Sequence, residues 1–336
     1  EYRFILAGYT RRSNKGVHIL NISLDKPEMD GLNSKDTIGS GPDKREEISY
    51  MSLVDSDVRD HSRLLLNIED PSYMAIDADK LFVLSSRDEG GVKAYNFDRK
   101  REGLRPIGGV DMLGKAPCHL YFDRDKSLIY ASNYHLGRLD ILFLNEDGLS
   151  LAGSICLEGR GPISPNQDGP RCHMAIKDPS DRFTLVVNLG GDRVETYYID
   201  TEGYDLVSSY HTRPGMGPRH MVFGPGGRHV YLMGELDSTV EVLAYDNAKG
   251  TLRSISRVSS LPEGSESFTG NSGAAIKVTK LKNKVSVQIA DAGEIKKDII
   301  KILLAESNKT IKAKYNKKAD KIEFKTNQLG IFAIMN

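Results

Sequence analysis

The hydrophobic residues of this chain fall in short runs that are rich in β-branched and aromatic side chains. Turn-forming residues separate neighbouring runs, as Pro225, Gly226 and Gly227 do between two apolar stretches. Other runs, such as TVEVLAYD at residues 239–246, alternate apolar and polar positions with a period of two. Runs of this length, composition and period are typical of β-strands. The pattern predicts an all-β protein with few helices.

The same succession of runs recurs along the chain with a period of about 50 residues. Four segments align, and their first residues are Pro71, Pro117, Arg171 and Pro218. One position of the repeat always carries an aromatic side chain. These residues are Tyr73, His119, His173 and His220. A fifth copy starts at NSGAAIKVT, and the N-terminal FILAGYTRRSNKGVHIL matches the second half of the unit. An internal repeat of this length indicates a modular architecture rather than two unrelated domains.

Each repeat holds enough runs for four strands, the fourth of which we expect in the connector, as in LRSISRV at residues 252–258. Four strands in about 50 residues are the signature of a propeller blade. A pair of β-sandwiches is the rival fold, but a sandwich does not call for such a period. We therefore expect an all-β propeller of six to seven four-stranded blades. The half unit at the N-terminus predicts a ring closed by pairing of the two chain ends, which would also hide sheet edges.

Several ionisable and polar residues stand where strands of the repeat begin or end. In a propeller the first strand of each blade lines the central channel, and the second strand returns to the same face. Residues just before strand one and just after strand two therefore meet on one rim, as ligand sites at the mouths of closed β structures do. The residues expected on this rim are His119, Asn133, Tyr134, Arg171, His173, Asn188, Arg219, His220 and Glu235.

The predicted rim combines groups that suit the hydrolysis of a carbonyl compound. Imidazoles accept a proton from water near neutral pH, and guanidinium groups bind anions or stabilise an oxyanion. Glu235 would orient a histidine or act as a base itself. A structural interpretation stays open, because polar side chains at strand starts also bond to neighbouring blades. Three aligned histidines with two adjacent arginines favour a functional site, and no Gly-x-Ser-x-Gly elbow points to a serine nucleophile.

Composition narrows the possible partners. The chain has 46 basic and 46 acidic residues, so no net charge favours nucleic acid or a membrane surface. No apolar stretch approaches the ~20 residues that span a bilayer. Its cysteines, at Cys118, Cys156 and Cys172, fit no zinc motif and indicate reduced thiols in a cytoplasmic protein. We expect a small-molecule substrate, no nucleic acid and no membrane; no feature indicates an oligomeric state.

A set of phrases gives the chain a family resemblance over residues 4–278. They include LAGYTRRSNKGVHIL, APCHLYFD, NQDGPRCH, NLGGDRVETY, GPRHMVF, GELDSTVEV and FTGNSGAAIKV. In order and spacing they resemble the lactonase family of seven-bladed propellers, whose best-known activity is that of a 6-phosphogluconolactonase. The resemblance implies seven blades and hydrolysis of a sugar lactone, most directly 6-phospho-D-glucono-1,5-lactone, in the cytoplasmic pentose phosphate pathway. It also implies a reaction without metal or other cofactor.

The resemblance points to individual residues when it is carried over motif by motif. It marks His119 in PCH, Arg171 and His173 in GPRCH, Arg219 and His220 in PRH, and Glu235 in GELDST. We predict as catalytic residues His173, His220, Glu235 and His119. We predict as substrate-binding residues Arg171, Arg219, Asn133, Tyr134 and Asn188. Many relatives have an Arg-Gln before a Pro-His-x-His, and an Asp-Leu-Gly, where this chain has Asn166-Gln167, Arg171-Cys172-His173 and Asn188-Leu189-Gly190.

The C-terminal residues differ in composition from the rest of the chain. Residues 1–280 carry 34 basic and 40 acidic residues, whereas residues 281–336 carry 12 lysines, no arginine and 6 acidic residues. We therefore divide the chain into a lactonase-like propeller at residues 1–280 and a divergent, Lys-rich tail at residues 281–336. The tail either closes the ring with unfamiliar strands or is a grafted β-sandwich-like segment. The alternatives to a lactonase are a non-catalytic binding propeller and a lactone-forming cycloisomerase of the carboxymuconate type.

Overall fold

The computed structural model describes most of the repeat region and short parts of both ends. The described residues are 2–7, 16–22, 62–85, 90–98, 100–111, 114–261, 272–281, 284–291, 300–304, 309–316, 321–323 and 332–335. Every regular element in these ranges is a β-strand, which confirms the predicted all-β class. Within the same ranges the protein has no helix of the length and apolar character that crossing a membrane requires.

Four complete blades follow one another, each an antiparallel sheet whose strands are in sequence order. The first consists of β4 (Pro71–Asp77), β5 (Lys80–Ser85), β6 (Gly91–Asp98) and β7 (Gly103–Asp111). The second consists of β8 (His119–Asp123), β9 (Leu128–Asn133), β10 (Arg138–Asn145) and β11 (Gly148–Cys156). The third consists of β12 (Cys172–Lys177), β13 (Thr184–Asn188), β14 (Arg193–Ile199) and β15 (Tyr204–His211). The fourth consists of β16 (Pro218–Phe223), β17 (His229–Gly234), β18 (Thr239–Asp246) and β19 (Thr251–Ser259), so the strand predicted in LRSISRV is present.

The two ends of the chain form three further sheets. The N-terminal sheet has β1 (Tyr2–Ala7), β2 (Gly16–Ile22) and β3 (Ser62–Asn67). A hairpin of β20 (Gly273–Leu281) and β21 (Lys284–Asp291) starts the fifth repeat. The last sheet has the order β24-β23-β22-β25, from β22 (Ile300–Leu304), β23 (Lys309–Asn316), β24 (Lys321–Glu323) and β25 (Phe332–Met335). The division at residue 280 stays a prediction.

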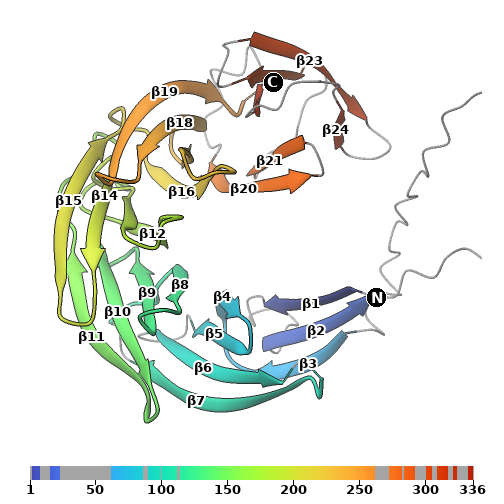
Figure 1. Cartoon of the computed structure of the whole chain (residues 1–336), viewed down its shortest axis with the longest axis vertical. Helices are drawn as coiled ribbons and strands as arrows, with labels where there is room; N and C mark the ends of the chain where they lie inside the picture. The colour runs from blue at the N-terminus through green and yellow to red at the C-terminus, as the bar shows by residue number, and fades with distance from the viewer. Residues whose placement is uncertain are drawn as a thin grey trace, which may run out of the picture.

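The sheets are arranged around a common centre, as the prediction of a propeller requires (Figure 1). The first strands of successive blades, β4, β8, β12 and β16, lie innermost and contact their neighbours, and β20 continues the series. The fourth strands lie on the outside. Among the described strands, those of the N-terminal sheet pair only with one another, and β25 pairs with β22. The expected pairing of the two chain ends is therefore not seen in the described part of the chain.

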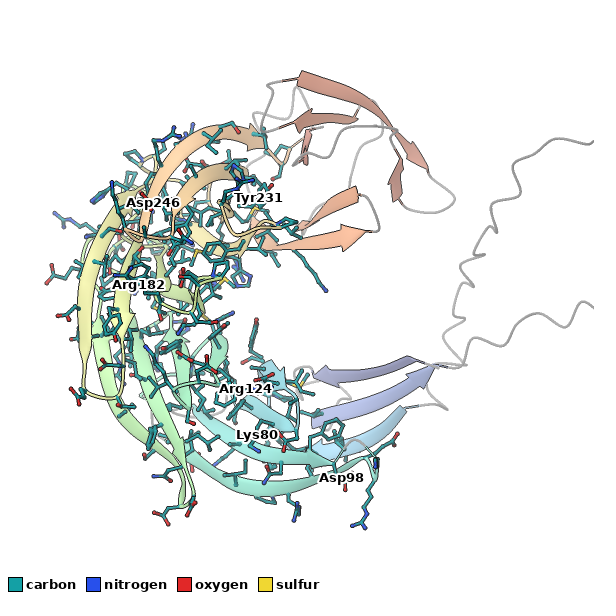
Figure 2. The ribbon with its side chains drawn as sticks, in the orientation of Figure 1. Lys80, Asp98, Arg124, Arg182, Tyr231 and Asp246 are labelled. Atoms are coloured by element: carbon teal, nitrogen blue, oxygen red, sulfur yellow. The ribbon has the colours of Figure 1, made fainter. Side chains whose placement is uncertain are left out.

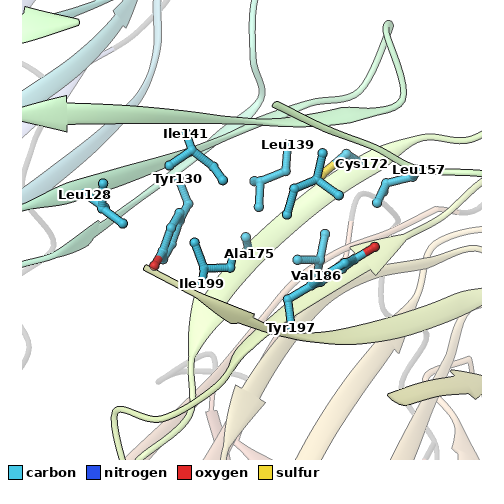
Figure 3. Packing of buried hydrophobic residues seen from close by; sticks show 11 residues of the cluster. Leu128, Tyr130, Leu139, Ile141, Leu157, Cys172, Ala175, Val186, Tyr197 and Ile199 are labelled. Atoms are coloured by element: carbon cyan, nitrogen blue, oxygen red, sulfur yellow. The ribbon is translucent and has the colours of Figure 1, made fainter. Parts of the chain in front are cut away.

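The hydrophobic core lies between neighbouring blades. Side chains fill the spaces between successive sheets, and the labelled Tyr231 is fully buried (Figure 2). Figure 3 shows one such layer, in which Leu128, Tyr130 and Leu139 of one blade pack against residues of the next blade that include Val186 and Ile199. Because β9 and β13 are buried along their whole length, each holds consecutive apolar residues, at 128–131 and 185–187, instead of an alternating pattern. Packing between blades fixes how the first strands meet at the centre.

A buried ion pair also joins two neighbouring blades. Lys177 Nζ at the end of β12 lies 3.0 Å from Asp123 Oδ2 at the end of β8, and the two side chains are only 3% and 4% exposed. The Tyr130 hydroxyl donates a second hydrogen bond to the same carboxylate at 3.0 Å. Both charges are thus removed from water but remain paired, which is the condition under which buried charge is tolerated.

Replacing Lys177 by Met should destabilise the protein by about 3–5 kcal/mol, because it leaves the Asp123 carboxylate buried without its cation. The matched control is Lys93→Met. Lys93 Nζ lies 2.7 Å from Asp111 Oδ1, but these side chains are 33% and 66% exposed. The loss of unfolding free energy in this control should therefore be about 0.2–1 kcal/mol. Denaturant unfolding of the three proteins measures the difference. Equal losses in both variants would contradict this account of the buried pair.

Candidate active site

The centre of the ring brings together the starts of three first strands. The structure starts β8 at His119, β12 at Cys172 and β16 at Pro218. The pairing register shifts between Cys172 and Met174 in one blade and between Pro218 and His220 in the next. Such bulges re-aim side chains and are frequent next to active sites. The chain therefore presents its polar residues at irregular points of otherwise regular strands.

The four equivalent ring positions of the repeat meet in space. The ring centroids of Tyr73 and His119 are 4.8 Å apart, those of His119 and His220 are 5.8 Å apart, and those of His220 and His173 are 5.2 Å apart. We call these four residues the ring cluster. The repeat spacing predicts that the three histidines meet at one rim, and in the structure they lie close together. Tyr73 was absent from the predicted site, although its place in the repeat was the signal that could have found it.

An ion pair lies beside the ring cluster. Arg219 Nη1 donates a hydrogen bond to Glu235 Oε2, and His173 Nε2 lies 4.0 Å from the same oxygen. The pair follows from the register of its two strands, in which Pro218 lies opposite Gly234 and the Glu235 N–H donates to the Gly217 carbonyl at 2.8 Å. A cation, a carboxylate and an imidazole thus share one point of the site.

Asp192 holds the segment that leads into β16. Its carboxylate accepts hydrogen bonds from the Gly215 N–H at 2.7 Å and from the Gly217 N–H at 2.8 Å. Asp192 itself is almost fully buried and has a positive φ of 50° in the turn between β13 and β14. Hydrogen bonds from two backbone N–H groups to one carboxylate fix the approach of the chain to Arg219 and His220.

Arg171 and Tyr134 extend the site beyond the histidines. The Arg171 Cζ atom lies 5.4 Å from the centre of the Tyr134 ring, which is the geometry of a cation–π contact. The Tyr134 ring in turn meets His173 edge-on, with centroids 5.7 Å apart. The structure therefore brings these two predicted substrate-binding residues to the histidines.

Asn133 and Asn188 have a different environment from the other predicted site residues. Both are fully buried, and both side-chain amides bond to backbone groups of adjoining loops. The side-chain Nδ2 of Asn133 donates to the Lys115 backbone carbonyl at 2.7 Å. The side-chain Oδ1 of Asn188 accepts from the Arg171 backbone N–H at 3.1 Å. These two side chains hold the loops on which site residues stand.

Cys118 also contacts the site, although we treated it only as a reduced thiol. Its Sγ lies 3.8 Å from His173 Nδ1 and 3.4 Å from the His173 carbonyl oxygen. Burial raises the pKa of the thiol to about 12, although the positive charge of Arg219 opposes this. The thiol therefore stays protonated at neutral pH, which makes it a neighbour of His173 rather than a nucleophile.

The histidines of the ring cluster are uncharged at neutral pH. Burial is the main cause and lowers the pKa of His119 to about 3 and that of His220 to about 4. Burial also lowers the pKa of His173 well below its usual value, and the charge of Arg219 acts in the same direction on His173 and His220. Each imidazole is thus uncharged, and the same shift makes it a weaker base than an imidazole of ordinary pKa. In the described part of the chain, no three His, Cys, Asp or Glu side chains are grouped so as to hold a metal ion.

Comparison with known protein families and relatives agrees with the fold and the motifs. The family described as "Lactonase, 7-bladed beta-propeller" matches residues 35–291. An uncharacterized protein of Lactococcus lactis subsp. cremoris is 30% identical over 281 residues, which cover 82% of this chain and 72% of that protein. The 6-phosphogluconolactonase of Bacillus subtilis is 32% identical over 224 residues, which cover 65% of this chain but only 63% of that enzyme. The chain thus spans less than two thirds of the length of this relative.

Solved structures of low sequence identity share the fold. A protein from Lactobacillus plantarum is 21% identical, with a TM-score of 0.66 and 99% of both chains covered. The periplasmic gluconolactonase PpgL of Pseudomonas aeruginosa is 20% identical, with a TM-score of 0.67, 96% of this chain and 81% of that chain covered. At this identity the likeness shows the architecture alone.

The lowered pKa values predict an acid-dependent loss of stability. An unfolded histidine titrates near pH 6.5, whereas His220 titrates at about 4 in the folded protein. Between these two pH values the unfolded state binds a proton that the folded state does not. The stability of the folded protein therefore falls as the pH falls from 6.5 to about 4. His220→Gln removes this contribution, and its melting temperature should depend less steeply on pH. Parallel curves of melting temperature against pH for wild type and variant would contradict the buried, neutral state of His220.

Proposed function

We propose that this chain, which belongs to the lactonase family of seven-bladed β-propellers, is a hydrolase that opens a sugar lactone at the ring cluster. The observation that carries the proposal is the meeting of three uncharged imidazoles with the Arg219–Glu235 ion pair. These groups supply a base, an anion-stabilising cation and a carboxylate within one site. The named 6-phosphogluconolactonase of Bacillus subtilis supports the same class of substrate.

The proposed reaction begins with water attacking the carbonyl carbon of the lactone. One of His173, His220 and His119 accepts the proton that the water loses. Arg219 stabilises the negative charge that forms on the carbonyl oxygen, and Glu235 orients the imidazole or shares its proton. The bond between the carbonyl carbon and the ring oxygen then breaks, and the imidazolium gives its proton to that oxygen. The products are a free hydroxyl and a carboxylic acid, which ionises.

The substrate that we propose is 6-phospho-D-glucono-1,5-lactone, with 6-phosphogluconate of the pentose phosphate pathway as product. Arg171 and Arg219 supply cations for the phosphate and the carbonyl, and Tyr134 contacts both Arg171 and His173. Asn133 and Asn188 contribute through the loops that they hold. Lactones of this kind open unaided in water, so a positioned base is enough to accelerate the reaction.

The cytoplasm is the proposed location. The three cysteines, Cys118, Cys156 and Cys172, are all free, and reduced thiols persist in that compartment. The proposed substrate also carries a charged phosphate, which hinders its passage through a membrane. Such a sugar stays inside the cell in which it forms.

The wild-type protein should open freshly generated 6-phosphogluconolactone well above the spontaneous rate. His173→Gln and Glu235→Gln should each reduce the catalysed rate about 100- to 10,000-fold, because each removes a group that handles the proton. Continuous measurement of acid release follows the reaction. His211→Gln is the matched control, since His211 is exposed on the outer strand β15 and its loss should leave the rate unchanged.

Two results would point to a different function. A folded, monodisperse sample that gives no acceleration would favour a non-catalytic binding propeller. Conversion of a carboxylated muconate to its lactone by the same sample would favour a cycloisomerase that uses the cationic rim. Activity that survives in both His173→Gln and Glu235→Gln would place the reaction somewhere other than the ring cluster.

A further inference from the structure

We infer that the two arginines have separate tasks: Arg171 recognises the phosphate at the far end of the substrate, and Arg219 acts at the lactone carbonyl. This assignment rests on the proposed function and specifies its substrate class, a lactone with a terminal phosphate. Under this assignment Arg171 determines the preference for phosphorylated over unphosphorylated sugar lactones. The two guanidinium groups differ in their partners, since Arg219 has a carboxylate and Arg171 has an aromatic ring.

Arg219 belongs to the reacting end of the site. Its charge is balanced by Glu235, whose Oε2 also lies 4.0 Å from His173 Nε2. The guanidinium is close enough to His173 and His220 to lower the pKa of both imidazoles. A cation that already has a carboxylate partner has little net charge left to attract a phosphate dianion. The same cation still offers N–H donors to an oxyanion beside the base.

Arg171 has the opposite character. Among the described residues no carboxylate lies within ion-pair distance of Arg171, and its Nη1 donates a long hydrogen bond to the Pro170 carbonyl at 3.4 Å. The buried Nε has no hydrogen-bond partner in the described part of the chain, but the same is true of the Arg219 Nε, so the carboxylate partner is what distinguishes the two arginines. Its contact with the Tyr134 ring leaves the positive charge of the guanidinium without a carboxylate to balance it. Arg171 is therefore the available cation of the site.

The backbone around Arg171 is fixed as an anion-binding residue requires. Its N–H donates to Asn188 Oδ1 at 3.1 Å, and its carbonyl accepts from the Leu189 N–H at 2.9 Å. Gly190 packs so closely that a Cβ atom there would lie 1.9 Å from the Gly169 carbonyl oxygen and 3.0 Å from Arg171 Cγ. The side chain therefore projects from a fixed point, and little order has to be gained when an anion binds.

Tyr134 contacts both Arg171 and His173. Its centroid lies 5.7 Å from that of His173 and 5.4 Å from Arg171 Cζ. A sugar lactone with its carbonyl at the histidines can therefore extend along Tyr134 towards Arg171. In 6-phosphogluconolactone the carbonyl and the phosphate stand at opposite ends of the carbon chain. Tyr134, which contacts both His173 and Arg171, offers the sugar a path between these two groups.

The experiment compares kcat/KM for 6-phosphogluconolactone with kcat/KM for glucono-1,5-lactone in wild type, Arg171→Gln, Arg171→Lys and Arg219→Gln. The ratio of the two values should fall about 10- to 100-fold in Arg171→Gln, as expected for a lost hydrogen bond to a charged group. Arg171→Lys should recover part of the ratio, since it keeps the charge without the planar fork. Arg219→Gln should lower both values and leave their ratio near that of wild type. An unchanged ratio in Arg171→Gln, or a ratio lost only in Arg219→Gln, would overturn the assignment.

A binding measurement separates this inference from the proposed function. 6-Phosphogluconate should raise the melting temperature of wild type more than gluconate does, and this difference should disappear in Arg171→Gln. A protein that shows the Arg171-dependent shift but opens neither lactone would keep the phosphate assignment and lose the hydrolase. A protein that opens lactones but shows no Arg171-dependent preference would keep the hydrolase and lose the assignment. A protein that shows neither lactone opening nor the Arg171-dependent shift would contradict both the hydrolase and the phosphate assignment.

Discussion

The ion pair between Arg219 and Glu235 sets the electrostatic character of the whole site. Glu235 balances the positive charge of Arg219, which nevertheless helps to hold the neighbouring imidazoles of His173 and His220 in their neutral form. The carboxylate oxygen that accepts from Arg219 also lies near His173, so one point of the site combines the groups that a proton transfer needs. Because this cation is paired, Arg171 remains as the cation available for an external anion. The proposed division of the site into a reacting end and an anion end rests on this single pairing.

The propeller architecture makes the pairing possible. An antiparallel register brings the start of β16 opposite the end of β17, so Arg219 and Glu235 meet although they are 16 residues apart in the sequence. Neighbouring blades bring His119 and His173 to the same place, and the layer of buried side chains between blades fixes that arrangement. The buried Lys177–Asp123 pair joins two of these blades at the other end of their first strands. Stability between the blades and geometry at the centre are thus consequences of the same packing.

The repeat spacing predicted the fold class and the meeting of His119, His173 and His220, because period and register together determine where strand starts lie. It identified Arg219 and Glu235 but not their bond, which depends on a bulge that the period does not encode. Tyr73 was left out of the predicted site although it shares its repeat position with the three histidines, and nothing in the sequence around Cys118 signals its contact with His173. The orientation of the Asn133 and Asn188 amides depends on loop backbone conformation, which hydrophobic patterning does not report.

The central claim is that the Arg219–Glu235 pair and the histidines act as one chemical unit. A double-mutant cycle on lactone opening tests it most directly, with kcat/KM measured for wild type, Arg219→Gln, Glu235→Gln and the double variant. Residues that act as a unit are strongly non-additive. The account predicts that the double variant is about as slow as the slower single variant. Losses that multiply in the double variant would show that the two residues act independently and would contradict the account.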